Sequence, residues 1–267
     1  MSQRIRHRFD ALRDAGKKGF VAYMGAGDPN LEATYELALG MEAAGVDVLE
    51  LGIPFSDPLA DGLVNQLAAQ RGLASGTTPE GVLETIRRIR KRSEIPIVLY
   101  IYYNLLHRRG VAAFAEAAAE AGVDGILALD LPPEEFDDYA AILERVGIDP
   151  IVLIAPTTPE ARIATIAQRA SGFVYYISRE GVTGMQSTVE SAIGERVDVI
   201  RKYTDLPIAV GFGVSNPEQA KTVASSADAV VVGSAIVNQI ATHGTRSELV
   251  TQTRDFTASL VAGAKSA

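Results

Sequence analysis

Cysteine and tryptophan are absent from the 267 residues, and histidine occurs only three times. Without cysteine the chain can have no disulfide, no thiolate nucleophile and no cysteine-ligated metal. The histidines, His7, His107 and His243, are too far apart in sequence to form a metal motif, and nothing beside them indicates a Ser-His-Asp triad. The sequence therefore predicts no metal site.

Positive charge and long apolar runs are also scarce. Lysine and arginine number 25 against 33 aspartates and glutamates, a net charge of −8, whereas nucleic-acid binding needs clustered positive charge. The one basic run, residues 87–92, falls in the last turns of a predicted helix, where cations complement the helix dipole. No apolar stretch reaches the ~18 residues of a membrane span, and no signal peptide is recognisable. We expect a cytoplasmic protein with no nucleic acid or membrane partner.

Short apolar runs alternate with helical patterns along the whole chain. Strands are predicted over residues 20–23, 46–51, 96–102, 125–129, 150–154, 173–177, 207–210 and 229–232. Helices are predicted over residues 4–15, 31–44, 111–121, 134–146, 160–168, 189–203 and 217–224. A further helix is predicted after the last strand, and the helices that follow the second strand are expected only after a long loop. Eight such repeats predict one α/β domain over residues 1–267, a (β/α)8 TIM barrel with an extra N-terminal helix.

The stretch 50–62, ELGIPFSDPLADG, places three carboxylates at and after the end of the second predicted strand. On this pattern alone, Asp57 and Asp61 are equally well explained as turn residues on a solvated loop. Glu50 is different, because an ionisable group that ends a buried strand does little for solubility. Active sites of TIM barrels lie at the carboxyl ends of the strands. Glu50 and Asp61 are therefore candidate catalytic carboxylates.

Glycines follow the sixth, seventh and eighth predicted strands, at residues 181–184, 211–213 and 233. Glycine often does no more than end a strand, but here three neighbouring strands share the feature. Backbone N–H groups at such turns, and a short helix starting at Ser234, can bind an anion. The pattern favours a phosphate site beside strands six to eight, with the reactive part of the substrate near strand two.

Together with YYN at 102–104, DLPPEE at 130–135, SREGVTG at 178–184 and GFGVS at 211–215, the stretch 50–62 resembles the tryptophan synthase alpha subunit family. The resemblance extends over essentially the whole chain. It implies a lyase that cleaves indole-3-glycerol phosphate, by a retro-aldol reaction, to indole and glyceraldehyde 3-phosphate in the last steps of L-tryptophan biosynthesis. It also implies an alpha2beta2 heterotetramer, in which indole passes to a beta subunit that carries PLP, and no cofactor in this chain.

The resemblance assigns roles to matching residues. Glu50 is implied to be the general acid and base, and Asp61 to be the carboxylate that contacts the indole N–H. Thr183 is implied to position Asp61. Further substrate-binding residues implied by the resemblance are Tyr23, Tyr102, Tyr175, Gly184, Phe212, Gly213, Gly233 and Ser234.

Two positions depart from the family pattern: Leu63 stands where proline is usual, and Gly25 where threonine is common. Both bear on partner affinity or coupling. A free-standing indole-3-glycerol phosphate lyase stays open as an alternative, as does a non-catalytic alpha-like activator of a beta subunit, although the Glu50 and Asp61 pair disfavours the latter. A sugar-phosphate isomerase barrel would share the phosphate site but would not account for residues 50–62.

Overall fold

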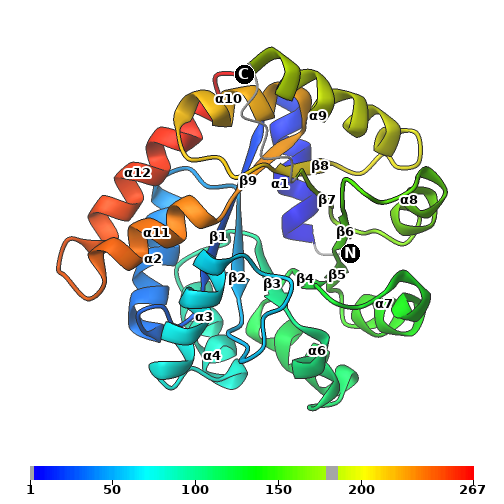
Figure 1. Ribbon diagram of the computed structural model, residues 1–267. Coiled ribbons are helices and arrows are strands. Elements are labelled where there is room, and N and C mark those ends of the chain that lie inside the picture. The colour runs from blue at the N-terminus through cyan, green and yellow to red at the C-terminus, as the bar shows by residue number, and fades with distance from the viewer. Residues whose placement is uncertain (1–2, 179–185) are drawn as a thin grey trace.

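The computed structural model describes residues 3–178 and 186–267 of the chain. Within these residues, parallel strands form one sheet at the centre of the molecule and helices surround it (Figure 1). The sheet order is β5-β4-β3-β2-β1-β9-β8-β7-β6. The strands are β1 (Gly19–Gly25), β2 (Val48–Gly52), β3 (Ile97–Ile101), β4 (Gly125–Ala128), β5 (Asp149–Pro150), β6 (Val152–Ile154), β7 (Val174–Ile177), β8 (Ile208–Gly211) and β9 (Ala229–Val232).

The fifth predicted strand is divided in two. β5 pairs with β4 and β6 pairs with β7, so the stretch 149–154 joins the two ends of the sheet. Between the two pieces, the Ile151 N–H donates to the Ile126 carbonyl at 3.0 Å. Pro150 has no N–H with which to continue a regular ladder. The predicted barrel is confirmed, and the divided segment 149–154 is where it closes.

Helices follow the strands as the sequence predicted, with two after β2 before the chain returns to the sheet. Thr78 and Asn216 cap helices with their side chains, accepting from the N–H groups of Gly81 and Gln219. The helices are α1 (Gln3–Asp14), α2 (Leu31–Ala43), α3 (Leu63–Ala74), α4 (Pro79–Arg90), α5 (Tyr103–His107), α6 (Val111–Ala121), α7 (Phe136–Arg145), α8 (Glu160–Ala167), α9 (Gln186–Arg201), α10 (Pro217–Ser226), α11 (Ser234–His243) and α12 (Leu249–Ala264), with a 3-10 turn at Pro133–Glu135. No helix in the described ranges is long and apolar enough to cross a membrane.

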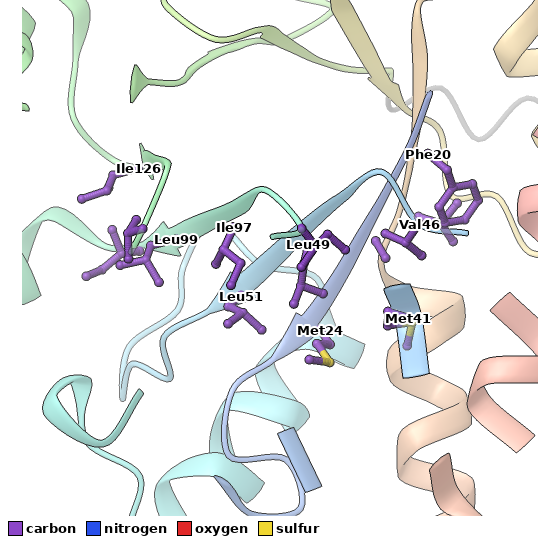
Figure 2. Packing of buried hydrophobic residues seen from close by; sticks show 14 of the residues in the cluster. Phe20, Met24, Met41, Val46, Leu49, Leu51, Ile97, Leu99 and Ile126 are labelled. Carbon is purple, nitrogen blue, oxygen red and sulfur yellow. The ribbon is translucent and has the colours of Figure 1, made fainter. Parts of the chain in front are cut away.

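Alternate residues of each strand point to opposite sides of the barrel wall. Leu49 and Leu51 pack outward, with Met24, Ile97 and Leu99, in the larger core between strands and helices (Figure 2). A second, smaller cluster fills the barrel interior, and it includes Val21, Val48, Val98 and Phe173. This alternation places residue 50, between Leu49 and Leu51, on the interior face.

Helix α1 closes the amino-terminal end of the barrel. Ile5 is fully buried in the interior cluster, and the Phe9 ring lies 5.7 Å from that of Phe173. Figure 1 accordingly shows α1 overlapping the strands rather than standing in the outer ring of helices. Glu50 lies near the opposite, carboxyl end of the barrel, on β2. One end is therefore closed by α1, and the other carries the candidate catalytic residue.

Two buried aspartates tie α1 to the strands. Asp124 lies just before β4, where its carboxylate accepts the Ile97 N–H at 2.8 Å and pairs with Arg90 and Arg4. Asp47, before β2, is within 3.6 Å of Arg8 on the next turn of α1. The basic residues at the start of the chain are thus partners for carboxylates at the amino ends of the strands.

We expect Asp124→Ala to lower the free energy of unfolding by about 3–5 kcal/mol, because it leaves the largely buried guanidinium of Arg90 without its charged partner. Urea denaturation measures the change. Glu84→Ala, which breaks the exposed pair with Arg87, is the control and should stay within about 0.5 kcal/mol of wild type. If Asp124→Ala lowered the free energy of unfolding no more than the control does, the proposed role of Asp124 at the amino end of the barrel would be wrong.

Candidate active site

Glu50 lies inside the barrel near the carboxyl end of β2, in register with Tyr23 on β1. Its side chain is 1% exposed, and its Oε1 atom has no hydrogen-bond partner among the residues described. Burial, and secondarily the charge of Asp61, raises the pKa of Glu50 to about 8. At neutral pH this group is therefore a carboxylic acid, able to give up a proton and then to accept one.

Asp61 lies in the irregular loop that connects β2 to α3, and two tyrosine hydroxyls hold its carboxylate. Tyr100 donates to Oδ1 and Tyr102 to Oδ2, both at 2.8 Å. The Tyr102 hydroxyl also accepts the Ala60 N–H at 3.0 Å. Burial, with the nearby charge of Asp61, raises the pKa of both tyrosines, so each remains a protonated donor. The loop carboxylate is thereby fixed to the end of β3.

Tyrosines form the wall of the site between the two carboxylates. The Tyr23 and Tyr100 rings meet edge to face, with centroids 4.9 Å apart. Tyr175, on the interior face of β7, is partly buried. Loss of solvent around its hydroxyl raises its pKa most, and both carboxylate charges add to the rise. Gly52 gives Tyr23 its room, because a Cβ there would lie 2.4 Å from the tyrosine hydroxyl. A small cavity lies among Tyr23, Tyr100, Tyr102, Asp61 and Asn65.

Tyr100 is a residue of the site that the sequence motifs do not include. The signal was present, because Val98, Tyr100 and Tyr102 alternate along the predicted strand and so share one face. Tyr102, expected to bind substrate, lines the same small cavity, and its hydroxyl donates to Asp61 and accepts from Ala60. Its contact with the substrate stays a prediction.

The candidate phosphate-binding residues follow two paired strands. Gly213 comes two residues after the end of β8 with a φ of +67°, and no atom lies within 4 Å of where its Cβ would be. Gly233 follows β9, and Ser234 begins α11, as expected from the sequence. Since β8 pairs with β9, these backbone groups lie at neighbouring strand ends.

Three of the predicted residues remain. Phe212 is partly buried and packs against the larger core between strands and helices, and its contact with the substrate stays a prediction. Thr183 and Gly184 lie outside the described residues. In the described parts of the chain, no group of three or more histidines, aspartates or glutamates is arranged to hold a metal ion.

Known proteins with similar sequences share one description. The sequence pattern of the family described as "Tryptophan synthase alpha chain" matches residues 9–264. Among curated relatives, the tryptophan synthase alpha chain of Opitutus terrae is 51% identical over 98% of this chain and 99% of its own. That of Thioalkalivibrio sulfidiphilus is 50% identical, over 90% and 91%.

Solved structures give the same result. Tryptophan synthase subunit alpha from Legionella pneumophila superposes with a TM-score of 0.92 at 36% identity, and the match covers 100% of both chains. A chain from tryptophan synthase of M. tuberculosis, in its aminoacrylate-bound form, gives 0.87 at 31% identity over 98% of this chain and 99% of its own. Sequence and structure together place the chain in the tryptophan synthase alpha chain family, and it is accordingly a lyase that cleaves indole-3-glycerol phosphate in tryptophan biosynthesis.

Proposed function

We propose that Glu50 and Asp61 carry out the cleavage of indole-3-glycerol phosphate to indole and glyceraldehyde 3-phosphate. The observation that carries the proposal is the buried Glu50 carboxyl, with a pKa of about 8 and an unpartnered oxygen, at the carboxyl end of the barrel. Such a group can both donate and accept a proton at neutral pH. An ordinary exposed glutamate is already ionised at that pH and is therefore a poor proton donor.

The reaction needs one proton at carbon and the loss of one at oxygen. Glu50 protonates indole C3, which converts the ring to an indolenine that can accept the electrons of the breaking C–C bond. The resulting Glu50 carboxylate takes the proton from the hydroxyl of the adjacent glycerol carbon, and an aldehyde forms as the bond to C3 breaks. Glu50 ends protonated, as it began, so this chain needs no cofactor for the reaction.

Asp61 acts on the opposite side of the indole ring. Protonation at C3 places positive charge at the ring nitrogen, and a fixed carboxylate that accepts the N–H stabilises that charge. The phosphate is bound by backbone N–H groups after β8 and β9 and by the amino end of α11, around Gly213, Gly233 and Ser234. Because β1 lies between β9 and β2, the proposed phosphate site is one strand away from the strand that leads into the Asp61 loop.

Exposed leucines mark the surface beside that loop. Leu59 is 83% exposed, and Leu63 and Leu67, one turn apart on α3, are 69% and 42% exposed. Exposed apolar groups that gather in one place are typical of interaction sites. Leu63 is the first residue of α3, the helical position where proline, usual in the family, is best tolerated. We place the docking site of a PLP-carrying beta subunit here, in an alpha2beta2 assembly in the cytoplasm.

Indole release from indole-3-glycerol phosphate, measured with and without a beta subunit, tests the proposal. We expect turnover by the chain alone and stimulation by the partner. Turnover without stimulation would favour a free-standing lyase, and no turnover in either case would favour a non-catalytic activator.

The pH dependence of kcat/KM gives a second test, because the free enzyme must hold Glu50 in its acid form. We expect kcat/KM to fall as the pH rises through about 8. Asp61→Asn removes the like charge that helps to raise this pKa, so the descending limb should move to lower pH in that variant. A wild-type profile that stays flat above pH 8 would contradict the assignment of Glu50 as the acid.

A further inference from the structure

The loop that carries Asp61 has little regular structure to hold a side chain in place. Residues 53–62 belong to no helix or strand. The Asp61 backbone is fixed by its N–H, which donates to Pro58, and by its carbonyl, which accepts from Gln66. Neither bond restricts rotation of the carboxylate. A carboxylate that must meet charge on a ring nitrogen therefore needs further contacts to fix its direction.

Strand β3 supplies those contacts from a rigid part of the barrel. Tyr100 is paired in the sheet with Gly52 on one side and Leu127 on the other. Its ring is packed against Tyr23, and its hydroxyl reaches Oδ1 of Asp61, while Tyr102 bonds Oδ2. The Asn65 amide on α3 adds a longer bond to Oδ1, at 3.4 Å. With donors on both oxygens, the plane of the carboxylate is set.

The two tyrosines differ in what else they hold. The Tyr102 hydroxyl also accepts the Ala60 N–H, so this residue anchors the loop backbone as well. In the parts of the chain that the structure describes, the Tyr100 hydroxyl bonds only the Asp61 carboxylate. A substitution at Tyr100 therefore tests the orientation of the carboxylate separately from the anchoring of the loop.

We propose that Tyr100 is a positioning residue for the cleavage reaction, whose hydroxyl holds Asp61 in the orientation that receives the indole N–H. The inference rests on the proposed role of Asp61. Oδ1 accepts from both Tyr100 and Asn65, whereas Oδ2 accepts the Tyr102 hydroxyl and keeps a lone pair for the substrate. The contact matters most when positive charge develops on the indole nitrogen, so it contributes to the transition state more than to substrate binding.

Steady-state kinetics of Tyr100→Phe test the inference. We expect kcat to fall roughly tenfold and KM to change by less than about twofold, since a hydrogen bond to a charged group is lost while the ring is kept. Tyr139→Phe is the matched control, because it removes a buried hydroxyl that donates to the Ile126 carbonyl at 3.3 Å, away from both carboxylates. Its kcat should equal that of wild type, and thermal unfolding of both variants checks their stability.

A double-mutant cycle with Asp61→Asn separates positioning from a merely structural role. If Tyr100 acts through Asp61, adding Tyr100→Phe to Asp61→Asn should cost little further activity, and the two effects will not add. Two results would overturn the inference: kcat of Tyr100→Phe equal to wild type, or the same loss of kcat in both backgrounds. Failure of the wild-type chain to release indole would instead overturn the proposed function.

Discussion

Replacing Glu50 with glutamine is expected to lower kcat for indole release by roughly 10²–10⁴-fold. The amide keeps the size of the side chain but cannot deliver a proton to carbon or take one from a hydroxyl. KM should change little, because Glu50 is assigned to proton transfer and not to binding the phosphate. Rapid-quench and steady-state assays of indole release measure both constants. Glu84→Gln, at an exposed position on α4, is the control, and a Glu50→Gln variant that kept most of its activity would remove Glu50 from the mechanism.

The same substitution should make the protein more stable at alkaline pH. The pKa of Glu50 rises from 4.5 to about 8 on folding, so between these values the folded state binds more protons than the unfolded state. Over this window Glu50 lowers the stability of the wild type by about 1.4 kcal/mol per pH unit. Glutamine does not ionise, so the stability of Glu50→Gln relative to the wild type should increase from pH 5 to pH 8. Glu50 would then lower the stability of the protein and still be required for its activity, as expected of a catalytic acid in a buried site.

Replacing Gly213 with aspartate is expected to raise KM by about 10²-fold or more. A carboxylate at this position would face the phosphate dianion, and repulsion of like charges a few ångströms apart near a protein surface amounts to several kcal/mol. The positive φ of +67° at Gly213 penalises any side chain, so the charge must be separated from the backbone effect.

Gly213→Asn makes that separation, because asparagine matches aspartate in shape and tolerates this conformation equally well. Its KM should stay within about tenfold of wild type, well below that of the aspartate variant. Initial-rate measurements over a range of substrate concentrations give both values. Equal KM for the two variants would show that the phosphate binds elsewhere.

Much of the fold could be predicted because its signals are local. Apolar runs such as residues 229–232, and helix starts such as Ser234, depend on short stretches of sequence, and the structure confirms them. The division of the fifth strand could not be foreseen, because it depends on how the sheet closes on itself. Nor could the partners of Arg4 and Arg8, since Asp124 and Asp47 are distant in sequence.

The site divides in the same way. Glu50 stood out because a charged residue ended an apolar strand, and its burial agrees with that reasoning. The contact between Asp61 and Tyr100 spans 39 residues and depends on the course of an irregular loop. The alternation of Val98, Tyr100 and Tyr102 indicates that they share one face of the strand. No periodicity or spacing in the sequence, however, encodes the course of the loop that brings Asp61 to them.

The central claim is that Glu50 is a protonated acid at neutral pH, and a direct titration of its carboxyl tests it. Infrared difference spectra between the wild type and Glu50→Gln, recorded from pH 4 to pH 10, isolate the C=O band of this one protonated group. We expect the band to persist at pH 7 and to disappear with a midpoint of about 8. A midpoint near the ordinary glutamate value of 4.5 would contradict the mechanism, because Glu50 would then hold no proton to give to the indole ring.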